Sequence, residues 1–498
     1  MQDANRAARC LTRLCQLTSV ELLISLWPVA LQMARLVNEF RRGPVSPQTT
    51  FDLENNLQRL LCEMGRRIVQ WTLNSLESRA PQDLPRSFLY EQDAYRRKRQ
   101  SPTRNLNCLF GPIRLWRWLY EPLDDLGLSA LFPLELQLGI VASVATPALA
   151  DRVARLAVDL TQRQLLDVLR QQHHVCWGTE TLRKVVAAMA QGLSPFRHQA
   201  QLTQLLGWLQ QASEQLGPRK ILLAVGRDGI MLPIRGFTKC KEGATATVSV
   251  YSRWGKRLGT VYLGQMPEEF QTSLSDELTQ LLEDLLRQWN GPALRLAFIT
   301  DAGFHPTEYF HNVLCHMPDP WRPGKSLEWE WVVDYYHACQ YISQLAQAIF
   351  GPGREAHAWA AKMRRTLKEK QAGVWRVLRS AGQLRAIRGL VGEASDYQSA
   401  YDYLRRHAAW MNYAERRRLR VPIGSGVTEA ACKIVFTQRF KCAGMKWNLE
   451  RDQPILVLRV IALSGIWSHT RTAMFNSLTK ALPRTPKEFY EKPEAICL

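Results

Sequence analysis

The order of apolar runs in the second half of the chain constrains the fold more than any other feature. Five runs read as strands: RKILLAVGRD (219–228), ATVSVYSR (246–253), RLGTVYLG (257–264), ALRLAFITD (293–301) and LEWEWVVD (327–334). Helical stretches follow the third and the fourth run, and residues 338–420 are helical and rich in Arg, Trp and Ala. Three strands followed by alternating helices and strands predict an α/β domain with a mixed sheet.

Two acids follow apolar runs of this predicted sheet. Asp228 and Asp301 each stand at the end of a run, before a turn that contains glycine. Ligand sites of α/β sheets lie beyond the carboxyl ends of strands, so the two side chains would converge if their strands are neighbours. Close carboxylates repel each other unless a cation lies between them, and oxygen ligands favour Mg²⁺ or Mn²⁺. Alternatively, each aspartate only caps the turn that follows it.

A third acid stands in the stretch VPIGSGVTEAACKIVFTQRFKCAGMKW (421–447). Gly424 and Gly426 allow a close approach of the backbone, and Glu429 would lie in the first turn of the helix that follows. Glu429 could complete a metal site, or it could simply compensate the helix dipole. The residues that flank this helix suit the binding of DNA phosphates: Lys433, Arg439, Lys441 and Lys446, with Trp447 beyond them.

The net charge of +20 indicates a polyanionic partner, and nucleic acid is the interpretation we favour. The 11 cysteines are odd in number and form no Cys-x-x-Cys pair, which argues for reduced thiols rather than a disulfide scaffold or a zinc finger. The run LLISLWPVAL (22–31) is short for a membrane span, and we interpret it as part of a packed helix in a soluble, intracellular protein.

The first half of the chain contains two stretches that could contact DNA. The basic stretch YRRKRQSPTR (95–104) is either a solvated linker or a phosphate contact, and it precedes a predicted hairpin of LNCLF and IRLWRWLY around Gly111-Pro112. Residues 147–192 read as three short helices, the third capped by Thr179. This pattern is compatible with a helix-turn-helix that presents Thr181, Arg183 and Lys184 to a groove, and equally with any three-helix bundle.

Two motifs resemble those of DDE-type insertion-sequence transposases of the Mutator-like group. In VVDYYHACQYI (332–342), Asp334 and His337 match an Asp-x-x-His pattern that this group has between its second and third acids. The stretch 423–447 resembles the Glu-bearing helix of one bacterial subfamily, through Gly424 to Gly426, Glu429, Arg439, Gly444-Met445 and Trp447. The resemblance covers roughly residues 90–470 and leaves 1–90 unmatched.

This resemblance implies an α/β fold with a ribonuclease H-like mixed-sheet catalytic core, an all-helical insertion and a preceding helical DNA-binding region. The expected segments are 1–90 (N-terminal helical region), 91–215 (hairpin and helix-turn-helix-like DNA-binding region), 216–337 (first part of the core), 338–420 (helical insertion), 421–470 (final helix of the core) and 471–498 (C-terminal tail).

The resemblance also implies a function, a metal and partners. Asp228, Asp301 and Glu429 look like the catalytic acids, which would hold two Mg²⁺ (or Mn²⁺) ions, with Asp334 and His337 near the site. The substrates would be double-stranded DNA, as terminal inverted repeats and as target. A homodimer or higher oligomer on DNA is expected, in the bacterial cytoplasm with the nucleoid and with no membrane partner.

Two departures from the family pattern accompany these expectations. The second acid stands in Asp-Ala-Gly, where the family has Asp-Gly-Ala, so the form of that turn is open. WLYEPLDDLG (118–127) lacks the cysteine cluster that members often carry after the hairpin, so we expect no structural zinc. Two other functions stay open: a catalytically inactive, transposase-derived DNA-binding protein, and a metal-dependent nuclease that cuts DNA without joining it.

Overall fold

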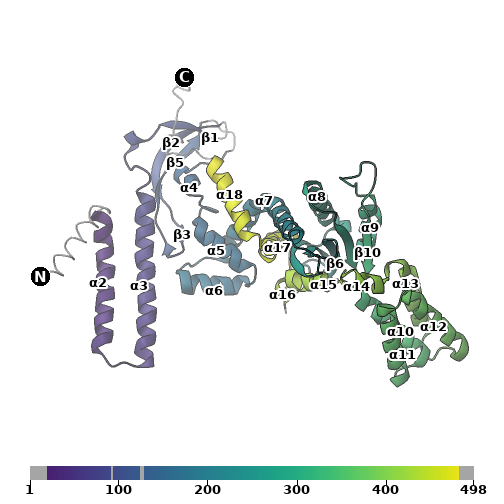
Figure 1. The fold of residues 1–498 in the computed structure, drawn as a ribbon. Coiled ribbons are helices and arrows are strands. Elements are labelled where there is room, and N and C mark those ends of the chain that lie inside the picture. Colours follow the sequence, from purple (N-terminus) through teal and green to yellow (C-terminus); the bar gives the residue numbers. More distant parts are fainter. Residues whose placement is uncertain (1–19, 91–92, 124–127, 443, 482–498) are drawn as a thin grey trace. The chain divides into compact units, whose positions relative to one another are not determined.

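The structure is a computed structural model, and it describes residues 20–90, 93–123, 128–442 and 444–481. The chain divides into two units, residues 1–192 with 472–498 and residues 193–471, each of which is described by itself (Figure 1). Predictions for residues 1–19, for 124–127 of WLYEPLDDLG and for the tail beyond 481 lie outside the described residues.

The first unit begins with a pair of helices, α2 (Val20–Arg42) and α3 (Pro47–Asn74), which pack along each other (Figure 1). Ser46 starts α3 through a capping box with Thr49. The apolar run 22–31 is helical as predicted, but the predicted packing is limited, because only Leu22 and Val29 of α2 are buried. By length and composition alone, α2 is apolar enough to cross a membrane.

Two small sheets follow in the first unit. One has the order β1-β2-β5 and the other pairs β3 with β4. Their strands are β1 (Ser87–Tyr90), β2 (Asp93–Pro102), β3 (Asn107–Cys108), β4 (Gly111–Pro112) and β5 (Trp116–Pro122), with the short helix η1 (Pro81–Asp83) before them. The predicted hairpin is right at its turn, where β3 pairs with Gly111-Pro112 and Ile113 N–H donates to the carbonyl oxygen of Leu106. It is wrong further along: residues 116–120 of IRLWRWLY pair with the basic stretch, most of which is strand β2 rather than a linker.

Helices complete the first unit. They are α4 (Pro133–Gln137), α5 (Pro147–Ala157), α6 (Gln162–His173), the start of α7 (Thr179–Ser213) and the end of α18 (Trp467–Ala481). Thr161 and Gln164 form a capping box at the start of α6, and His174 ends it in the left-handed region. The prediction of three short helices holds for two of them, because α7 has 35 residues and continues into the second unit.

A mixed five-stranded sheet forms the centre of the second unit, as predicted. Its order is β10-β9-β6-β7-β8; β6, β7 and β8 are antiparallel neighbours, whereas β9 and β10 run parallel to β6. The strands are β6 (Leu222–Leu232), β7 (Lys241–Tyr251), β8 (Arg257–Gln265), β9 (Arg295–Thr300) and β10 (Trp329–Val333). One prediction is wrong: Asp228 does not end its strand, because β6 continues to Leu232.

Helices pack against this sheet. Those between strands are η2 (Glu269–Gln271), α8 (Thr272–Gln288), α9 (Phe304–Asn312) and η3 (Leu314–His316). Those near the C-terminus are α15 (Gly426–Ala431), the π-helix η5 (Cys432–Thr437), α16 (Gln438–Phe440) and α17 (Leu449–Leu463). Arg459 of α17 is buried and donates through Nε to the carbonyl oxygens of Ile434 and Val435, at 2.7 and 2.9 Å. It thereby satisfies acceptors of the irregular π-helix.

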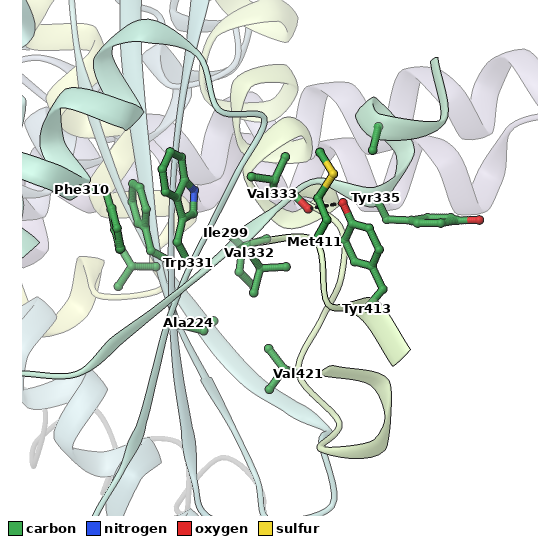
Figure 2. Packing of buried hydrophobic residues seen from close by; sticks show 14 of the residues in the cluster. Ala224, Ile299, Phe310, Trp331, Val332, Val333, Tyr335, Met411, Tyr413 and Val421 are labelled. Atoms are coloured by element: carbon green, nitrogen blue, oxygen red, sulfur yellow. Dashed lines mark hydrogen bonds between the residues drawn. The ribbon is translucent and has the colours of Figure 1, made fainter. Parts of the chain in front are cut away.

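The helical insertion shares one hydrophobic core with the sheet. Its elements are α10 (Tyr335–Phe350), α11 (Arg354–Glu369), α12 (Gly373–Arg388), α13 (Ala394–Arg406), η4 (Ala408–Trp410) and α14 (Tyr413–Arg418). Figure 2 shows Met411 and Tyr413 beside the end of β10, where the Tyr413 hydroxyl donates to the carbonyl oxygen of Val333 at 2.9 Å. The ring of Trp410 lies 4.6 Å from that of Trp331 on β10. The insertion is thus fixed to the sheet by packed aromatic side chains.

Candidate active site

Asp228 lies on β6, and Asp301 directly follows the neighbouring parallel strand β9, at the same level. The last paired residues of β6 and β9 are Val225 and Phe298, and each aspartate stands three residues further along its strand direction. The two acids also affect each other electrostatically. Burial, and then the negative charge of Asp301, raise the pKa of Asp228 to about 6, and Glu429 adds a smaller contribution of the same sign.

Helix α15 brings Glu429 to these aspartates. A side chain on Gly226, two residues before Asp228 on the same face of β6, would place its Cβ 1.9 Å from Thr428 Oγ1. Glycine is therefore required where the helix crosses the strand. The hydroxyls of Thr428 and Thr247 lie 2.9 Å apart and are buried, which fixes α15 to β7 as well. Glu429 follows Thr428 directly, in the first turn of the helix as predicted, and its side chain is exposed.

A thiol that the sequence analysis missed lies beside the first acid. Cys432 follows Glu429 by one helical turn, and its Sγ donates to Asp228 Oδ2 at 3.4 Å. Burial and the negative charge of Asp228 raise the pKa of this thiol, so it stays protonated and can act as a donor. The sequence could have indicated this contact, because Cys432 stands three residues after Glu429 and residues at that spacing share a helix face.

Asp334 is not exposed to a ligand, although it lies close to the third acid. Its carboxylate is buried and accepts hydrogen bonds from the backbone N–H of His337 at 2.7 Å and from the N–H of Ser425. The Ser425 hydroxyl lies 2.7 Å from Asp334 Oδ2 and 2.8 Å from Glu429 Oε1. Asp334 thus starts helix α10 and holds the loop that precedes Glu429.

The insertion supports the turn at the second acid. The Tyr403 hydroxyl of α13 donates to the backbone carbonyl oxygen of Asp301 at 2.8 Å. The ring of His337 packs edge-on against the rings of Tyr403 and Tyr341, with centroids 6.0 and 5.6 Å apart, and among the described residues no hydrogen bond joins this ring to the three acids. Ala302 has a φ of 64°, a conformation that glycine favours, and the family pattern has glycine there. Gly303 N–H donates to Asp301 Oδ1 at 2.9 Å, which completes the turn.

The basic residues predicted to contact DNA fall into two groups. Lys433, Lys441 and Lys446 are exposed. Arg439 and Trp447 are buried, and the guanidinium lies over the indole ring at 5.1 Å from its centroid. Their burial does not support the predicted contact with DNA, because a cation–π pair in the interior contributes to packing instead.

Three further exposed cations follow Asp228 on the chain. They are Arg235, Lys239 and Lys241, in and beside the connection between β6 and β7. This connection is joined to the stretch after Glu429, because Arg235 N–H donates to the carbonyl oxygen of Trp447 at 2.8 Å. We call the six exposed cations of this region the basic rim: Arg235, Lys239, Lys241, Lys433, Lys441 and Lys446. The sequence analysis missed the three cations of the β6–β7 connection, and the run TKCK (238–241) marks two of them, Lys239 and Lys241.

The cations predicted in the first unit are also exposed. Arg183 and Lys184 lie on the first turns of α7, and Arg183 Nη2 donates to Gln162 Oε1 of α6 at 3.3 Å. Thr181 is half-buried. The start of α7 therefore presents cations to solvent beside α6, which leaves the helix-turn-helix prediction open.

The three acids have the ligand chemistry of a divalent-cation site, but their side chains do not enclose such a site. Carboxylate oxygens are the ligands that Mg²⁺ and Mn²⁺ prefer, and a cation would offset the like charges that raise the pKa of Asp228. Across the residues that the structure describes, no group of three or more His, Cys, Asp or Glu side chains is arranged so that it could hold a metal ion. The carboxylates thus influence one another without forming a complete set of metal ligands.

No protein-family model matches the chain, and neither does any curated protein. The sequence motifs and the arrangement of the acids are the features of this chain that bear on its function.

Proposed function

We propose that this protein is a DNA transposase of the DDE type with a ribonuclease H-like core. The observation that carries the proposal is the placement of Asp228 and Asp301 three residues beyond the last paired residues of β6 and β9, with Glu429 on the helix that packs on β6, although these acids are up to 201 residues apart in sequence (429 minus 228). Numbered one to five along the chain, the strands of the sheet have the order 5-4-1-2-3, with the first three antiparallel. This arrangement supports a ribonuclease H-like core, interrupted by the helical insertion after its fifth strand.

The proposed reaction is cleavage of a phosphodiester at the ends of a mobile element, followed by attack of the freed 3′-hydroxyl on target DNA. Asp228, Asp301 and Glu429 would hold two Mg²⁺ (or Mn²⁺) ions. When bound, these ions activate the attacking oxygen and stabilise the leaving oxygen. The basic rim would hold the DNA backbone beside the acids, because lysine and arginine neutralise phosphates.

Recognition of the terminal inverted repeats is assigned to the first unit. The exposed Arg183 and Lys184 stand at the start of a long helix, the position from which a helix-turn-helix contacts a groove. Strand β2 adds exposed Arg96, Lys98 and Arg99, which could contact phosphates. A homodimer or higher oligomer would join two element ends, as in the family that the motifs resemble.

A cleavage assay tests the proposal. Wild-type protein with Mg²⁺ or Mn²⁺ should nick DNA that carries the inverted repeats flanking its coding region. Asp228→Asn and Glu429→Gln should lower cleavage by orders of magnitude at similar DNA affinity. Glu308→Gln on α9 is a matched control, because this exposed acid accepts a hydrogen bond from Asn312 of its own helix and is not among the charges that raise the pKa of Asp228.

The products separate the proposed function from its alternatives. Joined strand-transfer products support a transposase, and nicks without joints would indicate a nuclease. DNA binding without any metal-dependent nicking by the wild-type protein would refute catalysis and leave a transposase-derived DNA-binding protein.

A further inference from the structure

Asp334 is a buried carboxylate whose partners in the described structure are hydrogen-bond donors rather than a cation. It is 0% exposed, and none of the described ion pairs involves it. Burying an ionised group is costly unless hydrogen bonds compensate it. The N–H groups of His337 and Ser425 and the start of helix α10 supply that compensation. The cost of burying this carboxylate indicates that Asp334 has a role in addition to packing.

The reason lies in the loop that Asp334 holds. Ser425 is 5% exposed and directs both its N–H and its hydroxyl toward Asp334 Oδ2. Gly424 lies against the same carboxylate: a Cβ there would be 3.4 Å from Asp334 Oδ2 and 2.9 Å from the ring of Tyr336. The loop therefore lies against the start of α10, with little space for a side chain at Gly424.

The same hydroxyl connects Asp334 to Glu429. It carries one proton, which it can donate either to Asp334 Oδ2 at 2.7 Å or to Glu429 Oε1 at 2.8 Å. When the proton points to Glu429, Asp334 still accepts two backbone N–H bonds. An apolar residue at 334 could not hold the loop and leave the hydroxyl free for the third acid.

We propose that Asp334 and Ser425 are positioning residues for Glu429: Asp334 holds the 424–426 loop, and the Ser425 hydroxyl orients the Glu429 carboxylate. This inference depends on the proposed function, because it assigns Glu429 as a metal ligand. It gives the Asp-x-x-His motif a specific task, in which Asp334 acts through the loop and the His337 side chain takes no part.

Hydrogen–deuterium exchange of the metal-free full-length protein tests the hold on the loop. Asp334→Asn keeps the side-chain volume but replaces one acceptor oxygen with an NH₂ group, so it cannot accept all the donors. Exchange within 423–431 should become at least several-fold faster. The matched control is Asp319→Asn, a buried aspartate that accepts N–H bonds from Trp321 and Arg322 elsewhere in the unit. Unchanged exchange in Asp334→Asn, or equal acceleration in the control, overturns the inference.

Mn²⁺ affinity tests the link to Glu429. Ser425→Ala should bind Mn²⁺ about 10-fold or more weakly, the usual effect of losing a partner of a metal ligand. In a Glu429→Gln background the same change should have no further effect, because it acts through the missing carboxylate. Additive losses would overturn the positioning role even if Ser425→Ala weakens binding. A wild-type protein that neither binds Mn²⁺ nor cuts DNA refutes the proposed function itself, whereas intact cleavage with unchanged exchange refutes only the role of Asp334.

Discussion

Ionised Asp228 should destabilise the folded protein at neutral pH, so that removing its charge raises stability. Burial, and then the charge of Asp301, raise its pKa from 3.8 to about 6. A carboxyl with a higher pKa in the folded state binds its proton more tightly there, so this favourable contribution is lost as pH rises from about 4 through about 6. The shift of about 2 units (about 6 minus 3.8) corresponds to about 3 kcal/mol, at 1.36 kcal/mol per unit.

Asp228→Asn keeps the shape of the side chain and removes the charge. Without divalent metal at about pH 7.5, we expect the free energy of unfolding to rise by up to about 3 kcal/mol. At about pH 4 the gain should nearly vanish, because wild-type Asp228 is then protonated in the folded state. The Asn oxygen can still accept the Gly229 N–H, which donates to Asp228 Oδ1 at 2.8 Å in the wild type. Urea unfolding at the two pH values measures the difference.

Asp319→Asn is a control for which we expect the opposite change in stability. Its carboxylate accepts a hydrogen bond from Arg322 Nε at 2.6 Å, so neutralisation should destabilise the protein at about pH 7.5. If Asp228→Asn is no more stable than wild type at that pH, or if its gain is the same at both pH values, the electrostatic reasoning about the three acids is refuted.

Three further substitutions address the neighbourhood of the acids. Gly226→Ala should lower the free energy of unfolding by about 1–3 kcal/mol through its clash with Thr428, and urea unfolding should show a smaller loss in a Thr428→Ala background; an equal loss in both backgrounds would disprove the clash. Tyr403→Phe removes the donor to the Asp301 carbonyl oxygen and should cost about 1 kcal/mol, with several-fold slower DNA cleavage at unchanged DNA affinity; normal cleavage would exclude its role. Ala302→Gly should raise the thermal midpoint, since it relieves a left-handed residue by about 1 kcal/mol; a lower midpoint would contradict this.

The sequence was informative where a pattern is local and periodic. The five apolar runs predicted five strands in their correct order, because burial of a strand on both faces leaves a continuous apolar signature. The Gly-Ser-Gly loop also predicted where the helix of Glu429 begins, because the backbone conformation of such a loop is determined by residues that are neighbours in sequence. The length of α7 and the partner of the 116–120 stretch were mispredicted, because pairing across tens of residues leaves no local mark.

The sequence by itself thus determined which residues carry charge and where chain segments become strands or helices. Only the tertiary structure decided which charges face solvent: it buried Arg439 and exposed Lys433, although both stand in the same basic stretch. It also decided that Asp334 holds a loop rather than a ligand, and that Cys432 lies beside Asp228. The physical reason is that burial and hydrogen bonding depend on surfaces brought together from distant parts of the chain, whereas secondary structure depends mainly on neighbours.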